Sequence, residues 1–277
     1  MKKAFLAFTP AILVLLVTLF IPLLILFIST ISWNSSQPFD QYIAFFSNGY
    51  NLTVLWRTIR ISILVMVICA LLGVPTAYYI SGLTDKWRKI AMAITVFPLL
   101  TNSAVRAFAW INILGKNGVI NNSLMSLGII QQPLDLLYAE LAIIIGSVYL
   151  FLPTMILALV GVMDAIDDEI IEAASTLGSN QFNVFFKIIF PLSLPGVVVG
   201  AILVFTGTMT AYTTPQLLGG NKYMMLSTYL RQNAVTLGNW EAAGVIAFIM
   251  IFITLITNTL LNALAKRLDR RLGTEEA

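Results

Sequence analysis

The stretch EAASTLGSNQFNVFFKIIFPLSLPG, residues 172–196, is unusually polar for a chain that is otherwise mostly apolar. Acidic side chains are favourable at the N-terminus of a helix, alanine is a strong helix former, and glycine commonly ends helices. The stretch therefore predicts a short helix over residues 167–177 that ends at Gly178. Five of the 13 acidic residues stand at or just before its start: Asp164, Asp167, Asp168, Glu169 and Glu172.

The second half of this stretch predicts a return to an apolar environment. Ser179, Asn180 and Gln181 supply side chains suited to a turn and a helix cap, and FNVFFKIIF then has the pattern of an amphipathic helix. Pro191 and Pro195 mark the passage into the next apolar run. Small residues beside a glycine leave room for a partner surface. Two interpretations of this loop therefore stay open: it docks on a partner protein, or it only connects two spans.

Composition places the chain in a membrane. The mean hydropathy is +0.89, and 58% of the 277 residues are hydrophobic against 10% charged. Soluble proteins have roughly half their residues apolar and about a quarter charged. The net charge of +3 comes from basic residues scattered in twos and threes beside apolar runs, which is typical of topology signals. We therefore expect a polytopic membrane protein that binds no nucleic acid.

Apolar runs long enough to cross about 30 Å of hydrocarbon, which takes roughly 20 helical residues, predict six transmembrane helices. We expect an all-α membrane protein with a single transmembrane domain over residues 1–277. The predicted spans lie near residues 5–28, 58–82, 90–114, 139–162, 194–213 and 244–264.

Basic residues orient these spans. If six helices alternate, the Lys and Arg clusters fall on one side, which the positive-inside rule makes cytoplasmic. Both termini are then cytoplasmic, and so is the polar loop of residues 164–193. The clusters are Lys2 and Lys3; Lys86, Arg88 and Lys89; and the segment KRLDRR at residues 266–271.

Several kinds of chemistry are disfavoured. The chain has no histidine and a single cysteine, Cys69, so the commonest general base, the commonest zinc ligands and an internal disulfide are missing. No paired-carboxylate or nucleophile motif favours an intramembrane enzyme. No G-x-x-x-x-G-K-[ST] motif occurs, so we expect no ATP hydrolysis by this chain. We expect no catalytic residue, no metal site and no bound cofactor.

The polar stretch has a specific spacing. Glu172, Ala173 and Ala174 are followed by three residues and Gly178, and nine further residues lead to IIFP. This spacing resembles the EAA signature of the permeases of binding-protein-dependent, type I ABC importers. The sequence has Phe190 where that signature usually has leucine. The position of the loop before the penultimate predicted span also fits the family.

The resemblance implies a type I permease fold and a coupling helix that docks on an ATPase subunit. It further implies a second homologous permease, two ATP-binding subunits that use ATP and Mg²⁺ at the cytoplasmic face, and a periplasmic or extracellular solute-binding protein. The chain would lie among the lipids of a bacterial inner membrane. The residues expected to contact or approach the ATPase are Glu172, Ala173, Ala174, Gly178, Ser179 and Asn180.

Within the family, three segments resemble the first permease of spermidine and putrescine importers. They are residues 105–128, 190–196 and 214–220. The resemblance implies a small polar or cationic solute, with a polyamine favoured. Similar segments occur in importers of aminophosphonates and opines, which stay open as alternatives. Ala211 stands where several polyamine permeases are expected to have an acid, just before Tyr212.

Candidate residues for the substrate path follow from the charge of a polyamine. Carboxylates and aromatic faces bind such cations, although the aromatic residues also suit a role as membrane-interface anchors. Arg106 is an intramembrane charge that we expect to pair with Glu140 or Asp135, or to reach the outer interface. The candidates are Arg106, Trp110, Glu140, Tyr149, Tyr212 and Glu241.

A secondary transporter that works alone is the remaining alternative. Such a transporter typically has an ion-coupling carboxylate in mid-membrane or an inverted repeat. No Asp or Glu lies in the middle of a predicted span, and no repeat of 20–50 residues is visible.

Overall fold

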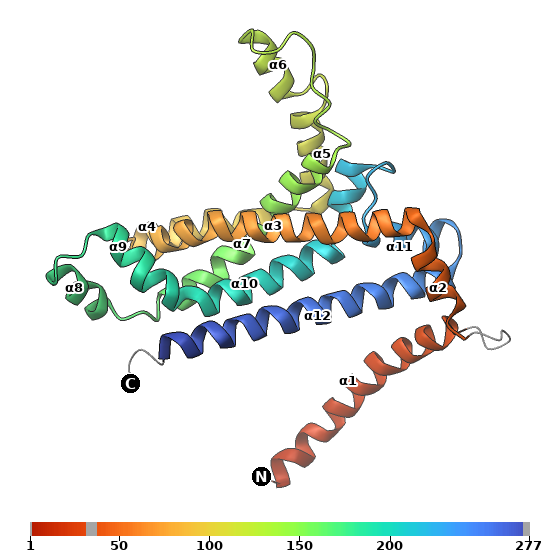
Figure 1. The fold of residues 1–277 in the computed structure, drawn as a ribbon, viewed down its shortest axis with the longest axis horizontal. Helices are drawn as coiled ribbons and strands as arrows, with labels where there is room; N and C mark the ends of the chain where they lie inside the picture. Colours follow the sequence, from red (N-terminus) through yellow and green to blue (C-terminus); the bar gives the residue numbers. More distant parts are fainter. Residues whose placement is uncertain (1, 32–37, 274–277) are drawn as a thin grey trace.

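The computed structural model describes residues 2–31 and 38–273, which form helices and connecting turns with no strand in these two ranges (Figure 1). The helices and π-helical turns are α1 (Lys2–Ser29), α2 (Asp40–Ser47), α3 (Gly49–Ser81), α4 (Asp85–Leu100), α5 (Ser103–Leu114), α6 (Val119–Ser126), α7 (Glu140–Met163), α8 (Asp168–Thr176), α9 (Gln181–Val184), η1 (Phe185–Ile189), α10 (Phe190–Thr210), η2 (Pro215–Gly219), α11 (Leu226–Arg231), η3 (Gln232–Thr236) and α12 (Trp240–Gly273).

The core lies where α3, α7 and α10 pack on one another, with α12 against α10 and α1 against α12. Met155 of α7 is fully buried at this junction. A Cβ atom on Gly73 of α3 would lie 2.7 Å from the Met155 side chain, and one on Gly200 of α10 would overlap its sulfur. Small residues allow membrane helices to approach closely. Both glycines therefore make room for Met155 between three helices.

The chain is an all-helical membrane protein with four to five candidate spans. Among the described residues, four segments are long and apolar enough to cross a membrane: Gly49–Ser81, Glu140–Met163, Gln181–Thr210 and Trp240–Lys266. A fifth arises if Asp85–Leu100 and Ser103–Ser126, which are bent by 95°, form one span. In α1, the segment Leu16–Ser29 is apolar but shorter.

The range 90–114, expected as one span, is broken into α4 and α5. Pro98 lies near the end of α4, and the side chain of Asn102 accepts a hydrogen bond of 2.8 Å from the Ala104 amide to cap α5. The guanidinium of Arg106 donates to the Pro98 carbonyl and, at 3.3 Å, to the Thr101 hydroxyl. In lipid, carbonyls freed by a break need a new donor. Arg106 provides one, and α5 and α6 project away from the bundle (Figure 1).

The penultimate long helix begins earlier than the predicted range of 194–213, because α9, η1 and α10 are continuous from Gln181 to Thr210. Pro191 and Pro195 therefore lie within helical structure instead of before it. Proline removes the donor that would bind the carbonyl four residues earlier, which for Pro191 is Lys187. Lys187 lies in the π-helical turn η1, where the hydrogen-bond pattern has already changed.

The bundle has two ends, each formed by a different set of elements (Figure 1). The first contains α8, α9, the turn between α3 and α4, and the C-terminal part of α12 (Figure 1). The second contains α2, η2 and α11 (Figure 1). We refer to them as the α8 end and the α11 end.

Candidate functional site

The helix predicted over residues 167–177 is α8, and Gly178 ends it. Gly178 has a φ of +83°, and the Ser179 amide donates to the Ala174 carbonyl at 3.1 Å. A hydrogen bond from an amide to the carbonyl five residues earlier, with a glycine of positive φ just before that amide, is the Schellman motif that ends a helix. No heavy atom lies within 4 Å of a Cβ placed on Gly178, so the turn is open to approach from outside.

The residues expected to dock divide into two groups. Ala174 is buried and belongs to the core cluster that includes Val184. The side chain of Asn180 accepts a hydrogen bond of 2.8 Å from the Asn183 amide, so it caps α9. Five of the six are exposed in this chain: Glu172, Ala173, Gly178, Ser179 and Asn180.

Large apolar side chains extend this exposed surface. Leu177 is 87% exposed, beside the turn, and Phe182 is 70% exposed on α9. The rings of Phe182 and Phe186 pack with centroids 4.5 Å apart. Leu177, Phe182 and Phe186 were not among the residues expected to dock. The aromatic run FNVFF is the sequence feature that could have identified the two phenylalanines. We call Glu172, Ala173, Leu177, Gly178 and Phe182 the coupling surface, after the docking role that the EAA spacing predicts for this loop.

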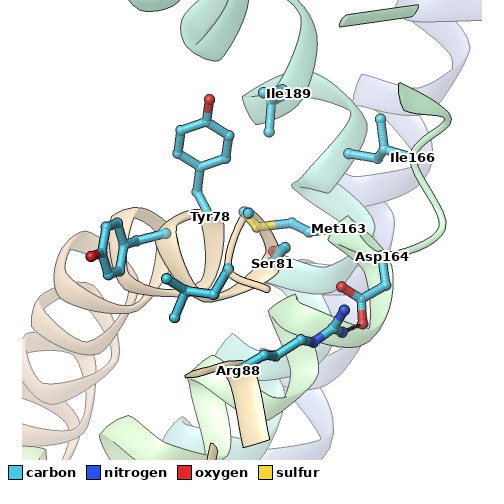
Figure 2. Close-up of a pocket in the computed structure, with 10 residues that line it drawn as sticks. Tyr78, Ser81, Arg88, Met163, Asp164, Ile166 and Ile189 are labelled. Atoms are coloured by element: carbon cyan, nitrogen blue, oxygen red, sulfur yellow. Dashed lines mark hydrogen bonds and ion pairs between the residues drawn. The ribbon is translucent and has the colours of Figure 1, made fainter. Parts of the chain in front are cut away.

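A cavity of about 420 Å³ lies between the α3–α4 turn and the ends of α7 and η1 (Figure 2). At its edge the Arg88 guanidinium on α4 points toward the Asp164 carboxylate at the C-cap of α7 and pairs with it (Figure 2). Asp164 is the first of the acids that precede α8. The pair therefore ties the start of the α8 segment to α4.

The expected pairing of Arg106 with an acid is wrong. Arg106 binds the α4–α5 joint, whereas Glu140 pairs with Arg57 at 3.1 Å and with Arg60, and Asp135 pairs with Lys116 at 3.0 Å. Glu140 is the first residue of α7 and contacts two arginines of α3. These arginines are distant from Glu140 in sequence but adjacent to it in space.

Two arginines compensate the charge of Glu140 more than fully. Arg57 also donates to the Met224 carbonyl at 3.1 Å, and its guanidinium carbon lies 5.3 Å from the centroid of the Tyr223 ring. Its side chain is only 13% exposed. Glu140 is therefore held by a structural network and is a poor acceptor for a further cation.

The candidate aromatic residues lie in two places. The rings of Trp110 on α5 and Tyr149 on α7 meet edge to face, with centroids 5.7 Å apart. Tyr212 instead lines a separate cavity of about 240 Å³ between η2, α11 and η3. The Arg231 guanidinium lies 4.4 Å from the centroid of the Tyr212 ring in that cavity. Its other polar lining side chains are neutral: Gln216, Asn221, Thr228, Gln232 and Thr236.

Glu241 lies in the first turn of α12 and has a different environment. It accepts a hydrogen bond of 2.8 Å from the side-chain amide of Gln41 on α2. The structure thus distributes the six candidate path residues over five local environments: the α4–α5 joint, the Trp110–Tyr149 contact of α5 with α7, the arginine pair of α3, the cavity of Tyr212, and the α2–α12 contact.

Residues 70–274 match the protein family described as the binding-protein-dependent transport system inner membrane component. The chain belongs to this family. The spermidine/putrescine transport system permease protein PotB of Haemophilus influenzae is 33% identical over 252 residues, which cover 87% of this chain and 88% of that protein. PotB of Escherichia coli K12 is 29% identical over 187 residues, 68% of each chain.

The fold is similar to that of a bacterial alginate ABC transporter, solved in complex with an alginate pentasaccharide-bound periplasmic protein. The TM-score is 0.80 over 96% of both chains at 17% identity. The chain is therefore a multi-pass permease of the bacterial inner membrane and works within a binding-protein-dependent transport complex. It is not itself catalytic, and its family is consistent with a chain that holds no cofactor.

Proposed function

We propose that this permease is one half of the translocation path of an ATP-driven importer. In this proposal α1 is a sixth span, α4 and α5 form one bent span, and both termini are cytoplasmic. The basic residues Lys86, Arg88 and Lys89 lie in α4 at the α8 end, and Lys266 lies in the C-terminal part of α12. The positive-inside rule places that end in the cytoplasm.

The partners follow from this orientation. Two ATP-binding subunits would lie below the membrane, one of them against the coupling surface, and a second homologous permease would complete the path. A solute-binding protein would dock at the α11 end. ATP and Mg²⁺ would be bound by the ATPase subunits, and the permease would contact only them, its homologue, the binding protein and membrane lipid.

The energy of ATP reaches the spans through α8 in this proposal. When the ATPase subunits close, α8 follows as a rigid element because buried Ala174 packs it on the core and Arg88–Asp164 ties its start to α4. Movement of α8 then displaces α4, α7 and α10 together, and access to the path changes from one side of the membrane to the other.

The coupling role can be tested with Glu172→Lys, because the exposed side chain contributes little to the stability of this chain. The assembled importer is reconstituted in proteoliposomes, and solute-stimulated ATP hydrolysis and uptake are measured. Loss of both with normal assembly supports the role of the coupling surface. Full retention of both overturns it. Uptake that needs an ion gradient and no ATPase would instead indicate a secondary transporter.

A polyamine is the substrate that we favour, and similarity to PotB carries this proposal. A solute with an anionic group, such as an aminophosphonate or an opine, is a second candidate. The cavity of Tyr212 favours it, because Arg231 supplies a cation there and none of the lining residues is acidic. Uptake of labelled putrescine, spermidine and an aminophosphonate by the same proteoliposomes distinguishes the candidates.

A further inference from the structure

A second cavity at the α11 end differs from that of Tyr212, because all of its lining side chains are uncharged. It measures about 250 Å³ and lies between α2, the start of α3, α11 and the start of α12. None of its lining residues is basic. The polar lining residues are Gln41, Asn48, Asn51 and Tyr229, and Phe45 and Val245 belong to the apolar wall.

Asn51 contributes a buried hydrogen-bond acceptor without a partner. The side chain is 8% exposed, and its amide nitrogen donates to the Phe45 carbonyl at 3.3 Å. Only the nitrogen can donate to a carbonyl, so this bond fixes the orientation of the amide. The Asn51 Oδ1 atom has no hydrogen-bond partner among the described residues. Buried acceptors normally have a donor, so a donor from outside this chain is expected.

Glu241 adds a negative charge that forms no ion pair with any cation among residues 2–31 and 38–273. Glu140 pairs with two arginines and Asp135 with a lysine, whereas Glu241 accepts only from the neutral amide of Gln41 within the described part of the chain. Gln41 itself lines the cavity, so Glu241 lies beside it. Asp40 precedes Gln41 on α2 and forms no ion pair with another described residue.

These groups suit a primary ammonium on an apolar chain. An ammonium has three donors and no acceptor, which matches the amide oxygens of Asn51 and Gln41 and the Glu241 carboxylate. The ring of Tyr229 offers an additional aromatic face. Methylene groups would contact Phe45 and Val245. The volume of about 250 Å³ is large enough for the end of an aminoalkyl chain.

We propose that the cavity between α2, α3 and α12 is an amine-binding site, at which Glu241 and the Asn51 Oδ1 receive an ammonium group of the substrate on its way into the path. The site rests on the proposed function as an importer of amines. It would hold one end of a polyamine after release from the binding protein.

The test uses the assembled importer with Glu241→Gln and Asn51→Leu, and Asp135→Asn as the control that removes a carboxylate paired with lysine. Equilibrium binding of labelled putrescine is measured in detergent without the binding protein, and the KM of putrescine uptake is measured in proteoliposomes with it. Loss of a charge-assisted hydrogen bond predicts about tenfold weaker binding and a similarly raised KM for Glu241→Gln. The maximal rate should stay within about twofold, and the control should equal wild type.

The outcomes separate this site from the function on which it rests. If wild type takes up putrescine but both variants bind it like wild type, the site is wrong and the polyamine function stands. If wild type takes up no polyamine yet binds putrescine in a manner that depends on Glu241, the site stands and the polyamine function is wrong. No putrescine binding by wild type overturns the site. If Glu241→Gln weakens only docking of the binding protein, the cavity receives a basic side chain of that protein, and the site is also wrong.

Discussion

Arg88 on α4 and Asp164 at the end of α7 form an ion pair at the point where the chain leaves the bundle for α8 (Figure 2). The two side chains are each 31% exposed. Partly exposed pairs of this kind contribute at most about 1 kcal/mol to folding. The importance of the pair therefore lies in its position, because it joins the segment that leads into α8 to α4.

We expect Arg88→Asp to reduce solute-stimulated ATP hydrolysis severalfold in the reconstituted importer with little change in thermal stability. Two carboxylates would then repel at the start of α8. The double variant Arg88→Asp, Asp164→Arg restores the attraction and should recover most of the coupling. Reversal of Asp135, whose ion pair with Lys116 is largely exposed at a distance from α8, is the control. Unchanged coupling in the single variant would exclude this role.

Gly178→Val should also reduce coupling. The φ of +83° strains any β-branched residue by about 1–2 kcal/mol, and the added side chain stands in the open space where a partner would approach. Gly178→Asn is the matched control for the strain, since asparagine tolerates positive φ. The measurement is uptake together with ATP hydrolysis. A valine variant that couples like wild type would show that the turn is not a contact.

The helix before Gly178 was predictable because its signals are local. Acids, alanines and Gly178 stand next to one another in sequence, and α8 with its glycine C-cap follows from them. The environment of Glu140 was not predictable, because Arg57 is 83 residues away and hydropathy carries no information on which helices become neighbours. Likewise, the position of Arg106 in the sequence did not reveal its acceptor. Arg106 donates to the Pro98 carbonyl, which the break between α4 and α5 leaves without a helical donor.

Gly200→Ala should destabilise the bundle. The new methyl group would overlap the sulfur of Met155, and overpacking of a core typically costs about 1–3 kcal/mol. Met155→Ala in the same chain makes room and should recover part of the loss. Gly161→Ala is the control on α7, since no heavy atom lies within 4 Å of the added carbon. Thermal unfolding in detergent measures all three; equal stability of the two glycine variants would contradict the packing.

Arg106→Met should loosen the joint between α4 and α5. The Pro98 carbonyl and the Thr101 hydroxyl both lose a charged donor, and the expected cost is about 1.5–3 kcal/mol. Because Arg106 binds backbone of its own chain, the KM for solute should change less than the stability. Thermal unfolding and uptake kinetics distinguish the two effects. A large rise in KM with unchanged stability would instead indicate that Arg106 contacts the solute in the substrate path.

Arg231→Gln should reveal which solute enters the cavity of Tyr212. An arginine over that ring repels an ammonium and attracts a phosphonate or carboxylate, so its removal has opposite effects on the two classes. For an aminophosphonate we expect the KM to rise about tenfold or more, as a charged hydrogen bond is lost. For putrescine the KM should be unchanged or lower. Lys222→Gln is the control, because Lys222 is also an exposed cation over a tyrosine, Tyr223, and does not line this cavity. If the KM values of both solutes change equally in the two variants, Arg231 does not select the solute. The polyamine is then the better supported substrate.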